Sequence, residues 1–203
     1  MHVHTRFSPC SIIRVRQLAK KLRDTGIDGV CITDHDTTAA RSLLKGLSDV
    51  SGLSIIIGLE YTTTQGDFLI FGPVDHIPQG MDAKTLLKWS TREGGVAIPA
   101  HPFRRSRPAD SGILHLFDII EALNGRNLAS ENDLCMHWIA SHGNSKKRIG
   151  GSDAHTPDEI GRIVTIFDKN IYTSEDLVRE LLHGQYSIRQ RYPQSANIPP
   201  YFL

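Results

Sequence analysis

An α/β fold with a mostly parallel sheet is the fold class that the 203-residue sequence predicts. Apolar runs of four to seven residues are rich in Ile and Val, as strands covered on both faces are. Segments with helical periodicity lie between these runs, and this alternating order is typical of parallel sheets. Neither an internal repeat nor a shift in composition marks a second domain, so we expect residues 1–203 to form one domain.

The individual elements follow from the same patterns. The expected strands are the runs at 28–33, 53–59, 68–71, 95–99, 117–123 and 162–167. Helical patterns cover 15–22, 82–94, 128–139 and 173–184. Gly26 is the expected C-cap of the first helix, and Thr173 opens a capping box at the start of the last one. The tail at 193–203 is expected to be irregular chain.

The charged residues nearly balance, with 23 Lys and Arg against 22 Asp and Glu and a net charge of +1. Without a basic run, this balance argues against a protein that binds nucleic acid through many phosphate contacts. Cys10, Cys31 and Cys135 show no CxxC spacing, which argues against a disulfide scaffold or a zinc ribbon. No apolar stretch approaches 18 residues and no secretory signal is visible, so we expect a cytoplasmic protein without membrane contact.

Metal-ligating residue types recur at the ends of the predicted strands. Ten histidines are the one oddity of the composition, and half of them take part in this pattern. Because active sites of parallel α/β folds form at the carboxyl ends of the strands, we expect these side chains to converge. The residues concerned are His2, His4, His35, Glu60, Asp67, His101, Asp153 and His155.

The spacing of these residues suits a metal centre. Residues i and i+2 of an extended segment share a side, so His2 and His4 can hold one ion, and Asp153 and His155 can do the same. Imidazoles with carboxylates and no thiolate cluster suit Zn, Mn, Fe or Ni, and a carboxylate such as Glu60 can bridge two ions. One strand-end histidine alone is usually a hydrogen-bonding residue. The conjunction of so many predicts a centre with more than one ion.

Five motifs in order, HVHTRFS, ITDHD, GLE, AHPFR and GGSDAH, resemble those of the PHP (polymerase and histidinol phosphatase) superfamily. They run from His2 to His155, about three quarters of the chain. The resemblance implies a distorted, TIM-like (β/α)7 barrel of the PHP type. It also implies two or three divalent metal ions at the carboxyl ends of the strands, which serve the hydrolysis of phosphoesters.

The resemblance also implies a set of ligands for each ion. His2, His4, Glu60 and Asp153 would hold the first ion. Glu60 would bridge to a second ion, completed by His101 and Asp67, and a third would lie between His35 and His155.

Two departures from the PHP pattern affect these sites. Many relatives have His where this chain has Asp67, although an aspartate still ligates. The ligand that usually follows the HxH motif is missing from the stretch 8–11. Cys10 could take its place, or it packs as a small apolar residue and the third ion is weak or arrives with phosphate.

Several residues near these motifs are candidates for handling the substrate. Arg104 and Arg105 could bind a phosphate group, since guanidinium matches its geometry, or they form a solvated pair in a loop. Asn124 and Arg126 are placed to line the mouth of the site. Asp36 could protonate the leaving group or orient a ligand, or it is the N-cap of a helix over 37–47.

The predicted function is hydrolysis of a phosphoester (a phosphomonoester, a nucleotide or an oligonucleotide end) by a metal-activated water, with Glu60 as the bridging catalytic ligand. The expected partner is a small phosphorylated substrate, and nucleic acid enters only as an end to be trimmed. A metal-dependent amidohydrolase is the second hypothesis, because the same ions would polarise a C–N carbonyl. A third is a non-catalytic, metal-stabilised module that binds a nucleotide. The sequence specifies no oligomeric state.

Overall fold

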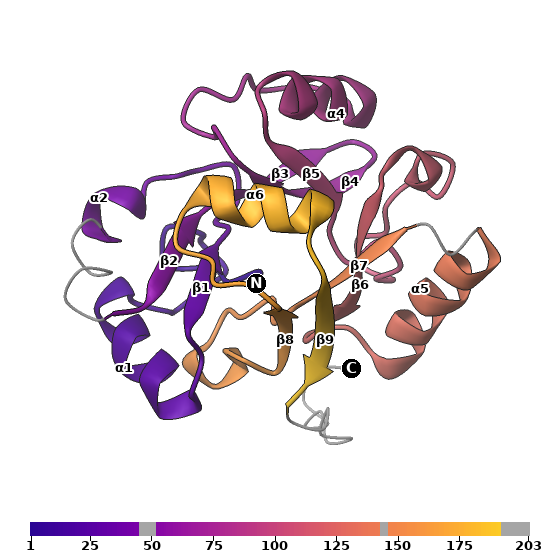
Figure 1. The fold of residues 1–203 in the computed structure, drawn as a ribbon. Coiled ribbons are helices and arrows are strands. Elements are labelled where there is room, and N and C mark those ends of the chain that lie inside the picture. The colour runs from indigo at the N-terminus through magenta and orange to yellow at the C-terminus, as the bar shows by residue number, and fades with distance from the viewer. Residues whose placement is uncertain (45–51, 143–145, 192–203) are drawn as a thin grey trace.

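A computed structural model of the protein describes residues 1–44, 52–142 and 146–191. It has a mixed α/β fold in which α1, α4 and α5 lie around the outside of the strands and the N-terminus lies near the centre of the view (Figure 1). The described elements, in order, are α1 (Val15–Thr25), β1 (Gly29–Ile32), α2 (Arg41–Leu44), β2 (Ser54–Ile57), β3 (Leu59–Thr63), β4 (Gly66–Phe71), α4 (Ala83–Arg92), β5 (Val96–Pro99), η1 (Leu114–Leu116), β6 (Ile119–Asn124), α5 (Ala129–Ser141), β7 (Lys147–Gly151), η2 (Pro157–Glu159), β8 (Ile163–Phe167), α6 (Ser174–His183) and β9 (Tyr186–Gln190).

The helices form where their local sequence predicts them. α1 buries Val15, Leu18 and Leu22 on one face and ends at Gly26, whose φ of 62° is the left-handed cap conformation. The last helix, α6, begins at its predicted cap, where the Thr173 hydroxyl accepts a hydrogen bond from the Asp176 amide at 3.0 Å. The expected helix at 37–47 is wrong in its first residues, because α2 begins only at Arg41, and residues 45–47 lie outside the described part.

All six predicted strands are present, but their directions are mixed. β1 pairs with β2 and β6 with β7 in parallel, whereas β3, β4 and β5 pair antiparallel, as do β8 and β9. The expectation of a mostly parallel sheet is therefore wrong for the antiparallel strands β3, β4, β5, β8 and β9. Residues Thr63 and Gly66 face each other across the β3–β4 turn, and so short a link cannot make the crossover that parallel pairing needs.

The strands follow one another around a ring. Val3 bridges both Ile32 of β1 and Ala154 beyond β7, so residues 1–5 lie between these strands. His35, just past β1, bridges Glu60 of β3. Around the ring the order is thus β5, β4, β3, β1, residues 1–5, β7 and β6. β2, which precedes β3 in the chain, also pairs with β1. β5 and β6 contact each other but share no ladder within the described residues, so the hydrogen-bonded ring is not closed there.

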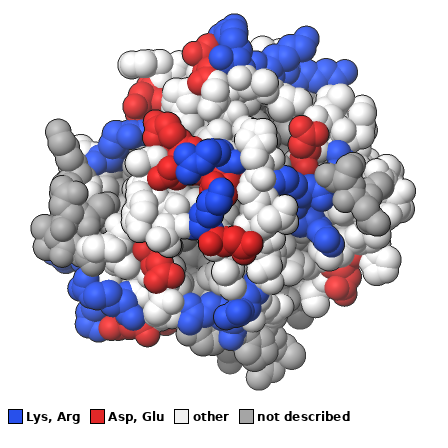
Figure 2. Space-filling model, viewed as in Figure 1, with Lys and Arg blue, Asp and Glu red and all other residues white. Residues whose placement is uncertain are grey.

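The surface agrees with the near-neutral composition. On the face seen in Figure 2, Lys and Arg alternate with Asp and Glu, and no continuous basic track crosses it. Across the described ranges, no helix has both the length and the apolar character that a membrane crossing requires. The tail predicted at 193–203 lies outside the described residues.

Candidate metal centre

The candidate ligands come together at one end of the ring of strands. His35 follows β1, His101 follows β5, and Asp153 and His155 follow β7. Glu60 is the second residue of β3, which continues the chain from β2. Asp67 stands at the start of β4 and still reaches this end of the ring, because β4 runs antiparallel to its neighbours.

Four of these residues form a tight central group, which consists of His2, His4, Glu60 and Asp153. The Nε2 atoms of the two histidines are 3.1 Å apart. Glu60 Oε2 lies 3.2 Å from His2 Nε2 and 3.0 Å from His4 Nε2. Asp153 Oδ1 lies 3.4 Å from the first of these nitrogens and 3.3 Å from the second. Four potential ligand atoms therefore face one point.

Glu60 reaches beyond the central group with its other oxygen. Glu60 Oε1 lies 2.9 Å from His101 Nε2, while Oε2 also lies 3.3 Å from His35 Nδ1. The two oxygens of one fully buried carboxylate thus face different imidazoles. This is the arrangement of a ligand shared between two metal sites.

A third group consists of His4, His35 and His155, whose ligand atoms lie within 4.8 Å of one another. The ring of His4 packs on those of His35 and His155, with centroids 4.5 and 4.3 Å away. Burial lowers the pKa of His35, and burial together with the nearby His4 lowers the pKa of His155 to about 4. Both imidazoles are therefore neutral at pH 7, as metal ligands must be.

Three of the imidazoles donate a hydrogen bond through Nδ1. The ionised Glu121 accepts from His2 Nδ1 at 2.8 Å, and the backbone carbonyl of Asp153 accepts from His155 Nδ1 at 2.9 Å. The Ser8 hydroxyl donates to Asp34, so it accepts from His4 Nδ1 at 3.3 Å. In each case Nδ1 donates, and Nε2 is the nitrogen left for a metal ion, which would take the place of any proton there.

The charge of the site also fits cations. Burial would raise the pKa values of Glu60 and Asp153, but the nearby His2, His4 and, for Asp153, Arg104 outweigh it, and both pKa values lie well below the usual range. The carboxylates in turn raise the pKa values of the two histidines against the effect of burial. The negative potential of these carboxylates, which favours protonated histidines, also favours bound metal cations.

A supporting carboxylate, Glu121, was not among the sequence-based candidates. It lies in β6 at 1% exposure and accepts hydrogen bonds from His2 Nδ1, from the His101 amide at 2.8 Å and from Asn124 Nδ2 at 2.9 Å. The signal that could have found it is a glutamate inside an otherwise apolar strand, since a buried carboxylate requires partners. Glu121 fixes the orientation of one candidate ligand and the backbone of another.

Backbone strain is concentrated at the site. Among the described residues other than glycine, positive φ occurs only at His2 (61°), Asp36 (50°), His101 (29°) and Asp153 (48°). Each such conformation costs on the order of 1–3 kcal/mol and persists only where the surroundings impose it. Gly151 is required by proximity, because a Cβ there would lie 2.1 Å from Glu121 Oε1 and 2.6 Å from His2 Cβ.

Arg104 and Asn124 support the centre from within. Arg104 donates to Asp153 Oδ2 at 2.6 Å, to Asn124 Oδ1 at 2.8 Å and to Asn127 Oδ1 at 2.9 Å. Asn124 is fully buried, so it does not line the mouth of the site, as the sequence had suggested. Arg126, by contrast, is 40% exposed, and its Nε lies 3.5 Å from Glu159 Oε1.

Four other candidates lie outside the ligand groups. Asp67 is buried, and its carboxylate accepts hydrogen bonds from Arg107 Nε and from Arg107 Nη2, the latter at 2.9 Å. Asp36 does not cap a helix, since its carboxylate accepts from the Thr62 amide at 2.9 Å. Cys10 and Arg105 are exposed and contribute to none of the groups found among the described residues.

Two sequence comparisons place the chain among known proteins. The PHP-associated family model matches residues 129–186. The uncharacterized protein MJ1587 of Methanocaldococcus jannaschii is 30% identical over 113 residues. That match covers 51% of this chain and 66% of the relative, just under two thirds of its length.

Three solved structures share the fold. PsfC from Pseudomonas syringae has a TM-score of 0.69 at 17% identity, and the match covers 87% of this chain and 82% of PsfC. A candidate metal-dependent phosphoesterase from Bifidobacterium adolescentis has a TM-score of 0.65 at 18% identity, with coverage of 89% and 94%. An amidohydrolase from Chromobacterium violaceum with bound sulfate has a TM-score of 0.58 at 14% identity, with coverage of 78% and 87%.

Proposed function

We propose that the chain is a metal-dependent hydrolase of the PHP superfamily and that it cleaves phosphoester bonds. The observation that carries the proposal is the position of Glu60. One of its oxygens faces His2 and His4, and the other faces His101. A carboxylate so placed can join two divalent cations, and paired cations are a common device of enzymes that cleave phosphoesters.

The ligand sets of the proposed ions follow the groups in the structure. His2, His4, Glu60 and Asp153 would hold the first ion, and Glu60 with His101 would hold the second. Asp67 would complete the second site only after it leaves Arg107. His35 and His155 would hold a third ion, and His4 could join them only by leaving the first ion, because the single lone pair on its Nε2 binds one cation. The exposed Cys10 lies outside this group. Imidazole and carboxylate ligands suit Zn, Mn or Fe.

Divalent cations bound here would supply a nucleophilic water at neutral pH and stabilise charge on the phosphoryl group. The chain itself supplies rigidity. Glu121 holds His2, and Arg104 holds the outer oxygen of Asp153, so the imidazole and the carboxylate keep their orientation when substrate arrives. We assign Arg104 this positioning role, although the sequence alone suggests contact with phosphate.

Substrate binding falls to the exposed polar residues at the mouth. Arg105 is exposed and Arg126 is 40% exposed beside Glu159, so both could turn toward a phosphate group, and we propose a small phosphorylated molecule as the substrate. Asp36 keeps one carboxylate oxygen beyond its bond to Thr62 and remains our candidate for protonating the leaving group. We also propose that the ring of strands is the distorted barrel of the PHP type.

A metal-dependent amidohydrolase is the alternative, supported by the fold shared with the amidohydrolase from Chromobacterium violaceum. The two functions differ in the bond cleaved, so p-nitrophenyl phosphate and a set of simple amides and lactams separate them. Hydrolysis of the amides alone would favour the alternative. A metal-loaded protein inert toward both would favour a non-catalytic module.

Metal dependence is the first test. Exhaustive chelation should abolish hydrolysis of p-nitrophenyl phosphate, and Mn or Zn should restore it better than Mg, because Mg prefers oxygen ligands and is a poor match for imidazoles. Elemental analysis before and after chelation reports the metal content. Full activity in protein shown to contain no metal would refute the proposal.

A further inference from the structure

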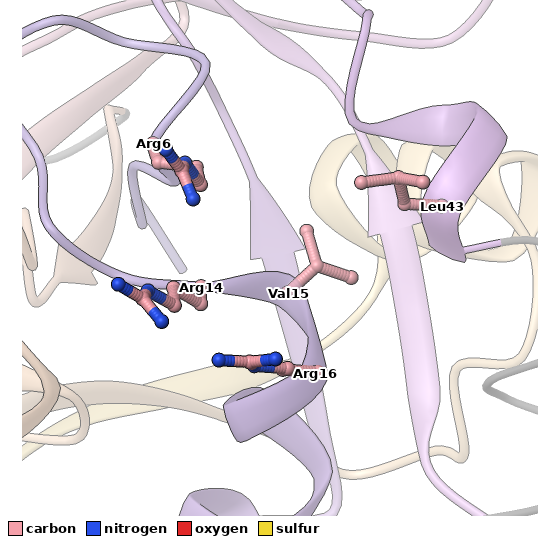
Figure 3. Close-up of a pocket in the computed structure, with 5 residues that line it drawn as sticks. All are labelled: Arg6, Arg14, Val15, Arg16 and Leu43. Carbon is pink, nitrogen blue, oxygen red and sulfur yellow. The ribbon is translucent and has the colours of Figure 1, made fainter.

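A basic hollow lies beside the start of α1, outside the candidate metal centre. Its volume is about 480 Å³, and its lining residues are Arg6, Arg14, Val15, Arg16 and Leu43. In Figure 3 the guanidinium groups of the three arginines lie together on one side of Val15, while Leu43 of α2 lies across from it. We propose that this hollow binds a phosphate group other than the one that is cleaved.

The three arginines have no counter-charge in the described structure. Within residues 1–44, 52–142 and 146–191, no ion pair is found for Arg6, Arg14 or Arg16, whereas Arg41 pairs with Asp75 at 3.0 Å. Three like charges that share one hollow repel each other, so a bound anion relieves that repulsion. The apolar side chains of Val15 and Leu43 line the rest of the hollow.

The start of α1 adds to the same field. Arg14 occupies the N-cap position and provides no side-chain acceptor, and the first turn contains no acidic residue. The positive end of the helix dipole at Val15 therefore lies beside the hollow, and no acidic side chain in the first turn compensates it. Basic residues in this position disfavour the helix, and a bound phosphate would reverse that effect.

The hollow belongs to the same end of the molecule as the metal centre. Arg6 stands two residues after His4, and α1 is the first helix after the N-terminal strand-like segment. α2, which carries Leu43, follows β1 and the ligand His35. Helices that follow strands begin at the carboxyl ends of those strands, which is where the ligands are. A phosphate in the hollow would thus belong either to a distant part of the substrate or to a free anion.

The binding itself is tested without turnover, so its outcome is separate from that of the proposed function. Chelator-treated protein is modified with phenylglyoxal, with and without inorganic phosphate at constant ionic strength, and mass spectrometry reports each arginine. Phosphate should protect Arg6, Arg14 and Arg16 and leave Arg23, at the far end of α1, unprotected. Equal protection of Arg23, or no protection of the three, would overturn the proposal.

Variants measure the contribution of each charge. Arg14→Gln and Arg16→Gln should each weaken protection of Arg6 by phosphate about ten-fold, the loss expected for one charge-assisted hydrogen bond. Arg23→Gln is the matched control and should leave the phosphate concentration for half protection unchanged. Unchanged phosphate binding in both hollow variants would also overturn the proposal.

The source of the phosphate is resolved with Mn-loaded protein, and this arm rests on the proposed function. A nucleotide with two phosphates is compared with the same nucleotide carrying one. If the substrate supplies the group, Arg14→Gln raises KM about ten-fold for the first and not for the second, with kcat unchanged. If free phosphate is the occupant, KM stays the same for both while protection by added phosphate persists.

Discussion

Substitution of Glu121 by glutamine tests whether the orientation of His2 controls metal binding. The wild-type carboxylate accepts three hydrogen bonds, from His2 Nδ1 at 2.8 Å, the His101 amide at 2.8 Å and Asn124 Nδ2 at 2.9 Å. A glutamine keeps the shape but replaces one oxygen with an NH2 group. No orientation of that amide can accept all three.

The two orientations of the new amide have different consequences. If the NH2 group faces His101 and Asn124, donors face donors at two buried contacts, at about 1–3 kcal/mol for each unsatisfied group. If it faces His2, the imidazole must accept at Nδ1 and carry its proton on Nε2. The second arrangement leaves fewer contacts unsatisfied, and it removes the lone pair that points at His4, Glu60 and Asp153.

We therefore expect E121Q to fold and to bind metal more weakly by about 10–100-fold, the usual cost of losing an outer partner of a ligating histidine. This corresponds to about 1.4–2.7 kcal/mol of binding free energy. Competition with a chromophoric chelator measures the zinc affinity, and circular dichroism confirms the fold. Glu180→Gln is the matched control, a carboxylate at 2% exposure that pairs with Arg179 and contacts no candidate ligand. Zinc affinity within two-fold of wild type in E121Q would refute the reasoning.

Two further predictions concern the bridging carboxylate and the thiols. Glu60→Gln should lower hydrolysis by at least ~100-fold, since even outer-sphere losses cost 10–100-fold, while the exposed His183→Ala should leave it unchanged; equal losses would reject the bridge. At pH 8, iodoacetamide should alkylate Cys10 at the same rate with and without metal. The buried Cys31 and Cys135, whose pKa values burial raises to about 11 and about 12, should remain unmodified in the folded protein. Mass spectrometry measures the alkylation of each cysteine, and protection of Cys10 by metal would show that Cys10 is a ligand.

The elements of the fold could be predicted from local sequence because their signals are local. The apolar face of α1 and the caps at Gly26 and Thr173 act within a few residues. The direction of β4 was missed for a different reason. Its reversal depends on a two-residue turn between Thr63 and Gly66, and an apolar run carries no mark of its direction in the sheet.

The candidate ligands were predictable because each lies next to a strand end, and the ring of strands makes all such ends meet. The role of Glu121 was not predictable from local sequence, since it depends on His2, a partner 119 residues away along the chain. Arg104 was found but given a different role. A sequence shows that a guanidinium is near the site, whereas only the packing of Asn124 and Asn127 around it shows which way it points.

The metal centre and the fold support each other through the same residues. The central group joins residues 2 and 4 to residues 60 and 153, and so ties the first strand-like segment to β3 and to the segment after β7. Glu60, Glu121 and Asp153 bring three buried carboxylates to this point, and Arg104 is the one Lys or Arg among the described residues that pairs with any of them. Buried charge of one sign is costly unless opposite charge compensates it. A protein with only structural needs would place apolar side chains here. The strained φ angles of His2, His101 and Asp153 and the excess of carboxylates are costs that cations in the centre would offset.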